Sequence, residues 1–291
     1  MPLNILDREI ESSVRTKLLE LEKKLNSDVV SFYGEIHPSV DKQFRDFIEQ
    51  LRSHDSTRRR LTIVLNTPGG SAETTEKLVL ITRFHYREIY FIVPDYAMSA
   101  GTVWCMSGDK IFMDYSSSLS PVDPQVFTGT KYVPALGYLD KVNEMIEKSR
   151  KGKLSQAEFI MLRELDLAEL RSYEQSRDLT ISLLEEWLVK YKFKNWRVHR
   201  TDPEKRGKRV SLTEKRERAR QIAELLNDTK RWHSHGRAIG IDSLRKILRL
   251  EIEDYSEDKD LRELIRGYND MLTGYVVRMG YKTFLHSRIY F

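Results

Sequence analysis

A pair of glycines and a serine stand at the ends of two neighbouring apolar runs. Residues 67–70 read Thr-Pro-Gly-Gly and follow the run 61–65, and residues 97–102 read Ala-Met-Ser-Ala-Gly-Thr and follow the run 89–93. Each motif is typical of a buried strand that ends in a tight turn and then enters a helix. Such turns can place the Ser99 hydroxyl beside unpaired backbone N–H groups. Acyl transfer needs this combination, because a serine oxygen attacks a carbonyl and fixed donors stabilise the oxyanion that forms.

The two turns allow different interpretations of their serines. Gly69 and Gly70 permit positive φ angles and a close approach of substrate, and Ser71 suits the N-cap of a helix over residues 71–87. Ser99 also has a simpler interpretation, since serine is a common N-cap residue. The pairing of two small-residue turns on successive strands, together with the family resemblance given next, favours a nucleophile at Ser99 instead.

Several motifs resemble those of a known family. They are residues 66–70, 96–102, 118–125, 32–36 and, more loosely, 232–237. They are similar to the serine dehydrogenase proteinase family, in the signal peptide peptidase A-like branch of the Clp protease/crotonase superfamily. The resemblance implies an α/β fold, with a Clp protease/crotonase-like core of parallel strands and crossover helices. It also implies a serine peptidase that hydrolyses peptide bonds through an acyl-enzyme and needs no cofactor and no metal.

The same resemblance implies which residues form the site. Ser99 would be the nucleophile, and Gly69, Gly70 and Ala100 would form the oxyanion hole. Clp proteases add a histidine shortly after the serine, but here no histidine follows Ser99 until His199. The signal peptide peptidase branch uses a Ser-Lys dyad, which agrees with a stretch that lacks histidine.

A lysine that acts as a base must be neutral part of the time, so burial has to lower its pKa. Residues 138–149 are predicted to form a helix with an apolar stripe, and Lys141 lies at the edge of that stripe. The spacing from Ser99 to Lys141 is also similar to that of Ser-Lys peptidases in this superfamily. We therefore expect Lys141 to be the base, with Lys131 in a predicted loop and Lys148 farther from the stripe as alternatives. The competing interpretation is a surface lysine that extends into solvent.

Composition limits the partners. The 291 residues include 49 Lys and Arg against 44 Asp and Glu, which gives a mixed surface with a formal net charge of +5. We therefore expect a protein or peptide substrate, and no nucleic acid partner in spite of the basic segment 197–210. No apolar run is long enough to span a membrane, and charged residues within 7–11 interrupt any signal sequence, so we expect a cytoplasmic protein. The resemblance implies a homo-oligomer, because proteins of that superfamily assemble as rings or stacks.

The pattern of elements divides the chain into two parts. Residues 1–150 alternate predicted helices and strands, as in a parallel sheet with right-handed crossovers, and would form the catalytic core. Residues 151–291 are predicted to form a mostly helical extension, with the basic loop near 197–210.

The sequence indicates the roles of three other polar residues and of Cys105 less specifically. His233 and His235 lack a third metal ligand at a recognisable spacing, so hydrogen bonding or a subunit contact is the expected role. Asp123 either orients a catalytic group or occupies a turn, since prolines flank it. Cys105 is expected to be a small core residue.

Two other functions are compatible with these motifs. A crotonase-type acyl-CoA enzyme would use the paired N–H groups for a thioester enolate and would not depend on Ser99. A scaffold protein would keep the same fold without catalysis.

Overall fold

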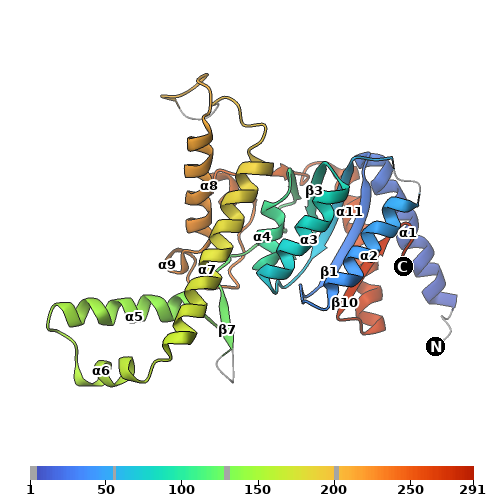
Figure 1. The fold of residues 1–291 in the computed structure, drawn as a ribbon. Helices are drawn as coiled ribbons and strands as arrows, with labels where there is room; N and C mark the ends of the chain where they lie inside the picture. The colour runs from blue at the N-terminus through green and yellow to red at the C-terminus, as the bar shows by residue number, and fades with distance from the viewer. Residues whose placement is uncertain (1–4, 55–56, 128–131, 200–202) are drawn as a thin grey trace.

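The structure is a computed structural model that describes residues 5–54, 57–127, 132–199 and 203–291 (Figure 1). Its centre is a six-stranded sheet in the order β10 (Thr283–Ser287), β1 (Asp28–Gly34), β2 (Arg60–Asn66), β3 (Glu88–Val93), β5 (Lys110–Met113) and β9 (Glu253–Asp254). Neighbouring strands run parallel except β10, which is antiparallel to β1. The predicted parallel α/β core is thus confirmed.

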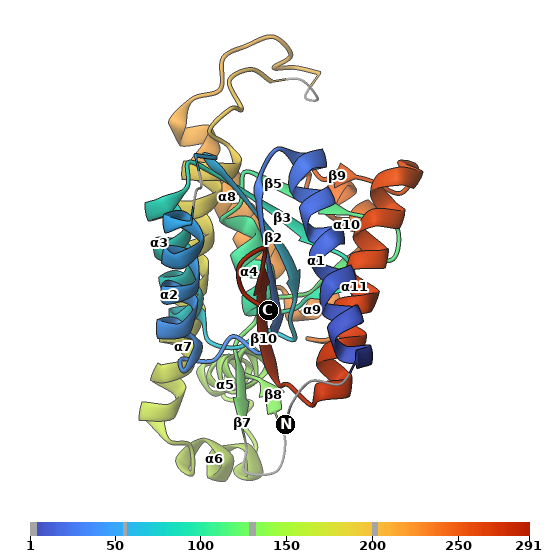
Figure 2. The same cartoon turned by 90° about the vertical axis from the view of Figure 1, so that its right-hand side faces the viewer.

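Helices cover both faces of this sheet (Figure 2). One face carries α2 (Val40–Ser53), α3 (Ala72–His85) and α4 (Ala100–Met106), and the other carries α1 (Ile5–Leu25) and α11 (Lys259–Met279). Successive side chains of a strand point to opposite faces. In β2, Ile63 and Leu65 accordingly pack in the core under α2 to α4, whereas Val64 packs with α1 and α11.

The remaining elements surround this sandwich. They are β4 (Tyr96–Ala97), β6 (Ser118–Leu119), β7 (Gln125–Phe127), β8 (Tyr132–Pro134), α5 (Ala135–Arg150), α6 (Gln156–Arg163), α7 (Leu167–Trp187), a π-helical turn (Leu188–Lys192), α8 (Leu212–Leu226), α9 (Thr229–Trp232) and α10 (Ile241–Lys246). Helices α5 and α6 and the first part of α7 project from the sandwich and are called the arm below (Figure 1). The end of α7 and α8 return to the main core, through Leu184, Trp187 and Ile222.

The second half of the chain also contributes to the sheet. Both edge strands, β9 and β10, come from it, and α11 packs beside α1 through Leu261, Ile265 and Val14. The sequence predicted a mostly helical extension for this region and did not predict these two strands. The division at residue 150 stays a prediction, although the sheet itself draws on both sides of that division.

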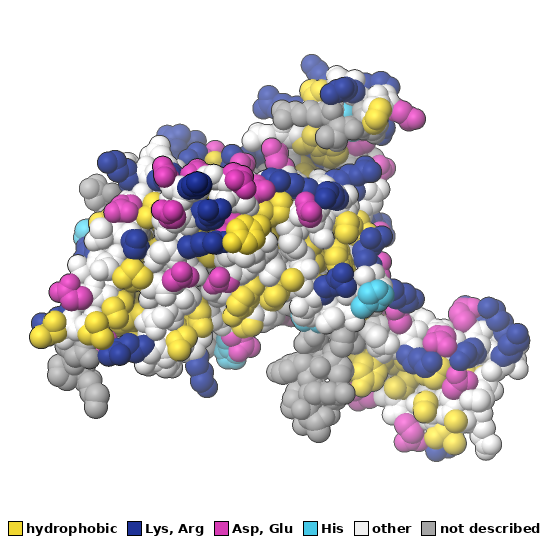
Figure 3. Space-filling view, turned by 180° about the vertical axis from the view of Figure 1, so that it is seen from behind, with side chains coloured by type: hydrophobic (Ala, Val, Ile, Leu, Met, Phe, Trp, Pro, Cys, Tyr) yellow, Lys and Arg dark blue, Asp and Glu magenta, His cyan; other side chains and the backbone are white. Residues whose placement is uncertain are grey.

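The surface mixes both signs of charge, as Figure 3 shows for one face. The predicted basic loop connects the π-helical turn to α8, and within its described residues Val198 and Arg209 form an antiparallel bridge. Its lysine Lys205 is paired with Glu214 at 2.9 Å. In the described part of the chain, none of the helices combines the length and the apolar character of a membrane-spanning segment.

Candidate active site

The glycine turn, which follows β2, and the serine turn, which follows β4, lie side by side. The Thr67 N–H donates to the Tyr96 carbonyl at 3.1 Å, and the Met98 N–H donates to the Thr67 carbonyl at 3.0 Å. Gly101 permits this close approach, because a Cβ there would lie 2.4 Å from the Thr67 Cγ2 atom. The structure therefore brings the glycine turn and the serine turn together.

Ser99 has a strained backbone and a free hydroxyl. Its φ of 50° and ψ of −117° lie in a region that L residues rarely adopt. It precedes α4 but its side chain makes no capping hydrogen bond, and its Oγ has no hydrogen-bond partner among the described residues. The residue is half-buried, so the hydroxyl is not sealed inside the core. This combination is typical of a nucleophile elbow, in which a sharp strand-to-helix turn presents the serine oxygen.

Three hydrogen bonds hold this backbone in place. The Ser99 N–H donates to Ser120 Oγ at 2.7 Å, and the Ser120 N–H donates to Thr102 Oγ1 at 3.0 Å. The Thr102 hydroxyl in turn donates to the Ala97 carbonyl at 2.7 Å. Strained backbone conformations persist only where the surrounding structure fixes them. Ser120 was not singled out from the sequence, although it lies within the 118–125 motif.

The two glycines make different contributions. Gly69 has a φ of +105°, and a Cβ there would lie 2.8 Å from the Ser99 Cβ, so only glycine leaves space for the serine. The Gly69 N–H already donates to Thr67 Oγ1 at 3.0 Å. Gly70 has a φ of +144°, and its N–H and the Ala100 N–H donate to no protein acceptor in the described part of the chain. Two of the three predicted oxyanion donors are therefore free, and Gly69 serves the turn through its missing side chain.

The predicted lysines lie on or near the arm. Lys141 is on α5 with 56 % of its side chain exposed, and its Nζ lies 3.1 Å from Glu144 Oε2. Lys148 contacts Glu144 at 3.0 Å and Glu158 at 2.7 Å, and these hydrogen bonds, that to Glu158 first, raise its pKa. Lys131 lies outside the described residues. In this single chain, Lys141 and Lys148 therefore have carboxylate partners.

A different lysine has the lowered pKa that a base needs. Burial lowers the pKa of Lys192 to about 8, and its neighbours include Glu251 and Cys105. Cys105 lies near the end of α4, whereas Ser99 precedes its first residue. Since an α-helix rises 1.5 Å per residue, this length of helix separates Cys105 from Ser99 by roughly 9 Å along the axis. Among the described residues, no hydrogen bond or ion pair joins Lys192 to the serine turn.

One contact joins two residues that the sequence had left without a role. His235 Nδ1 lies 3.0 Å from Asp123 Oδ1, and the two residues are 112 positions apart. No group of three or more His, Cys, Asp or Glu side chains placed to hold a metal ion occurs among the described residues. Among the described residues, His235 therefore takes part in a hydrogen bond with a carboxylate, as the sequence led us to expect, and in no metal-binding group.

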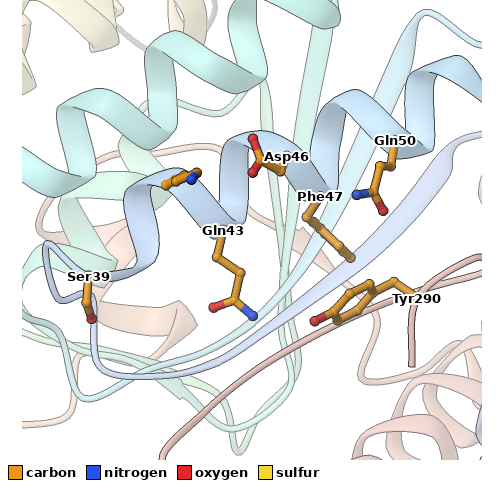
Figure 4. A pocket seen from close by; sticks show the side chains of 7 residues that line it. Ser39, Gln43, Asp46, Phe47, Gln50 and Tyr290 are labelled. Carbon is orange, nitrogen blue, oxygen red and sulfur yellow. The ribbon is translucent and has the colours of Figure 1, made fainter.

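A hollow elsewhere on the surface is unrelated to these turns. It lies between α2 and the C-terminal segment and is lined by Ser39, Gln43, Asp46, Phe47, Gln50 and Tyr290, among others (Figure 4). The Phe47 and Tyr290 rings meet edge to face at 5.5 Å. None of its lining residues belongs to the glycine turn or the serine turn.

Comparisons with known proteins identify relatives of part of this chain. Two uncharacterised proteins of Methanocaldococcus jannaschii are similar: MJ1495 is 31 % identical over 122 residues, and MJ0137 is 39 % identical over 66 residues. These matches cover 41 % and 23 % of this chain, and only 40 % and 23 % of those proteins. The chain thus spans less than half the length of these relatives.

Two solved structures are also similar, both of the membrane-bound stomatin-specific protease 1510-N. One is a serine-to-alanine mutant, with a TM-score of 0.46, 14 % identity and coverage of 80 % of this chain and 81 % of that chain. The other is a lysine-to-alanine mutant in complex with a substrate peptide, with a TM-score of 0.45, 14 % identity and coverage of 80 % and 76 %.

The sequence model of one family matches residues 43–202, which is more than half of the chain and includes both turns and the arm. This result confirms the predicted family and the predicted fold. The chain belongs to the family of ClpP-like SDH-type serine proteinases.

Proposed function

We propose that this protein is a serine endopeptidase with Ser99 as its nucleophile. The observation that carries the proposal is the state of Ser99, which has a positive φ and a hydroxyl that caps nothing. An ordinary N-cap serine has neither property, because its backbone is extended and its oxygen accepts a hydrogen bond from the helix. Membership of a serine proteinase family supports the same role.

The proposed reaction has two steps with one acyl-enzyme between them. The Ser99 oxygen bonds to the scissile carbonyl carbon while its proton passes to a base, and the carbonyl electrons move to the oxygen. The C–N bond then breaks, and the leaving amine takes the proton from the base. Water attacks the acyl-enzyme in the same way, gives its proton to the base, and releases the carboxylic acid as that proton returns to Ser99.

The Gly70 and Ala100 N–H groups are proposed to bind the oxyanion in both steps. Each is a fixed backbone donor with no protein acceptor in the described residues, so binding the oxyanion breaks no existing hydrogen bond. Removal of one such donor typically costs roughly 10²–10³ in rate. Gly69 is proposed to act only through its missing side chain, which leaves space for the Ser99 side chain.

Lys141 remains the base proposed from the resemblance. In this chain it is exposed and paired with Glu144. Lys141 therefore acts as a base only if it leaves Glu144 and becomes buried near Ser99. Removal of the amine in Lys141→Ala would then abolish most of the proteolysis, and near-normal proteolysis by this variant would exclude Lys141.

Assembly of several copies is proposed as well, and the arm is the part that suggests it. Helix α6 buries none of its residues, and Phe159, Ile160 and Met161 are 58 %, 48 % and 60 % exposed. Exposed apolar clusters of this kind commonly mark protein interfaces. We expect light scattering to show an oligomer that Phe159→Asp dissociates, and a monomeric native protein at high concentration would contradict the proposal.

The test of the nucleophile uses a fluorophosphonate probe and fluorescent casein. Ser99 should carry the label in the native protein, identified by peptide mass, and Ser99→Ala should neither label nor cleave casein. Ser71→Ala is the matched control, since Ser71 is the serine of the neighbouring turn, and it should label normally. Labelling that persists in Ser99→Ala would reject this nucleophile. A native protein that cleaves acyl-CoA and not casein would indicate the crotonase-type alternative, and one that reacts with neither would indicate a scaffold.

A further inference from the structure

The Asp123–His235 pair has the internal geometry of an oriented imidazole. Asp123 is 1 % exposed and His235 is 16 % exposed, and Asp123 Oδ1 lies 3.0 Å from His235 Nδ1. An ionised carboxylate accepts hydrogen bonds only, so Nδ1 is the protonated nitrogen. The lone pair of the ring is then on Nε2, the nitrogen that faces away from Asp123. The pair therefore presents one nitrogen that can accept a proton.

The backbone holds the two segments that carry this pair next to the segment that carries Ser99. Leu119 is paired with Ala97 in parallel on one side and with Ile239 in an antiparallel bridge on the other. The Leu119 N–H donates to the Ile239 carbonyl at 3.1 Å, and the Ile239 N–H donates back at 2.8 Å. Three segments thus lie next to one another in the order 97, 119 and 239. The outer two are separated by two strand spacings, or about 10 Å.

From these paired residues, each segment continues to one of the residues of the proposed site. Ser99 lies two residues beyond Ala97, Asp123 four residues beyond Leu119, and His235 four residues before Ile239. Because the Leu119–Ile239 pairing is antiparallel, equal steps in opposite directions keep two residues opposite each other. The Asp123–His235 hydrogen bond shows that the two segments remain adjacent that far. Ser120, between Leu119 and Asp123, accepts a hydrogen bond from the Ser99 N–H. The middle segment therefore contacts both the Ser99 segment and the His235 segment.

A purely structural role leaves one feature unexplained. Asp123 Oδ2 is buried and has no hydrogen-bond partner among the described residues. A buried carboxylate oxygen without a hydrogen-bond partner costs free energy. A reaction that uses the negative charge of this carboxylate would explain why the protein keeps it. A carboxylate that stabilises an imidazolium during a reaction is such a case. If the pair only held the two segments together, a neutral hydrogen-bonding pair would serve equally well.

We propose that His235, oriented by Asp123, accepts the proton of Ser99, so that the base is this imidazole and not Lys141. The inference rests on the proposed serine peptidase function and deepens it. As the Ser99 oxygen bonds to the carbonyl carbon, its proton moves to His235 Nε2, and Asp123 stabilises the imidazolium. The same proton then goes to the leaving amine when the C–N bond breaks. Catalytic hydrogen bonds of this kind are often completed only when substrate binds.

The inference also adds a part of the chain that the family match does not include. Asp123 lies within residues 43–202, whereas His235 lies beyond them. The matched segment would therefore supply the nucleophile, the oxyanion donors and the orienting carboxylate. The base would come from the segment between α9 and α10, which the Leu119–Ile239 bridge holds against the site.

The experiment compares three variants of the chain by fluorophosphonate labelling at Ser99 and by casein cleavage. We expect His235→Ala to slow both by roughly 10²–10⁴-fold, and added imidazole to restore part of the rate. Asp123→Asn should lower kcat by about the same order with little change in KM. His233→Asn is the matched control, because His233 is exposed on the same segment and its φ of 61° suits asparagine. It should react at the native rate.

The outcomes separate this inference from the proposed function. If the native protein is never labelled at Ser99, the proposed function fails and the inference fails with it. If the native protein and His235→Ala are labelled at the same rate, the function stands and the inference is overturned. A slow His235→Ala that imidazole does not rescue, with a lowered melting temperature, would show that the pair only fixes the two segments, and this also overturns it.

Discussion

The turn between β2 and α3 and the turn between β4 and α4 follow the same plan, yet their serines differ. Ser71 has an extended backbone, with a φ of −78°, and its oxygen accepts the Thr74 N–H at 3.0 Å as the cap of α3. Ser99 has a φ of 50° and caps nothing, although it also precedes a helix. The first serine lowers the energy of its helix, and the second keeps its hydroxyl free at the expense of backbone strain. The difference distinguishes a structural serine from a chemical one more clearly than the sequence motif does.

The largest effect is expected from Ser99→Gly. Glycine adopts a positive φ without a steric penalty, so this variant should gain about 1 kcal/mol in the free energy of unfolding. It should also lose casein cleavage by on the order of 10⁶-fold, since it lacks the nucleophile. Urea unfolding and the casein assay measure the two quantities on one preparation. A variant that is less stable than the native protein would show that the Ser99 backbone is not strained.

Gly69→Ala should have the next largest effect. Its Cβ would lie 2.8 Å from both the Met98 carbonyl oxygen and the Ser99 Cβ, and the φ of +105° adds strain. The serine turn has to shift, and a shift of about 1 Å can cost roughly 10²-fold in kcat/KM. Gly137→Ala is the control, because a Cβ there meets nothing within 4 Å and the residue lies inside α5. Equal activity of the two variants would mean that the glycine turn does not position Ser99.

Ser120→Ala tests the hydrogen bond that holds the strained backbone. The variant leaves the Ser99 N–H without its acceptor, which should cost about 1–3 kcal/mol in the free energy of unfolding. We expect kcat to fall by a smaller factor than for Gly69→Ala, because the hydroxyl and both oxyanion donors remain. A variant with native kcat and native stability would show that other contacts fix the serine turn.

Local periodicity explains why most of the fold could be predicted. The stripe of Val40, Phe44, Phe47, Ile48 and Leu51 predicts a helix over 40–52, and all five side chains are buried in α2. A helix repeat is visible within a few residues, so no distant contact is needed to recognise it. The cap at Ser71 could be predicted for the same reason, since it depends on the neighbouring turn alone.

The parts that were not predicted depend on contacts between distant residues. Strand β10 pairs with β1, for example Leu285 with Phe32, and nothing in its five residues indicates that partner. The Asp123–His235 contact is of the same kind, because an aspartate near prolines is typical of a turn. The apolar stripe beside Lys141 predicts a helix, which α5 confirms, but the stripe alone cannot show that α5 belongs to a projecting arm. Local patterns thus predict elements, and long-range pairing decides which of their side chains meet.

Ser71→Ala should have the smallest effect on activity and completes the comparison. It removes the acceptor of the Thr74 N–H and should lower the free energy of unfolding by about 1 kcal/mol. For a chain of this size, such a loss lowers the melting temperature by roughly 2–4 °C. Casein cleavage per folded molecule should stay at the native rate, because the Ser71 oxygen is committed to α3 and not to substrate. A loss of kcat in Ser71→Ala would mean that this cap also positions the Gly70 N–H next to it. The two turns would then form one site, and the reaction would require the serine of each turn.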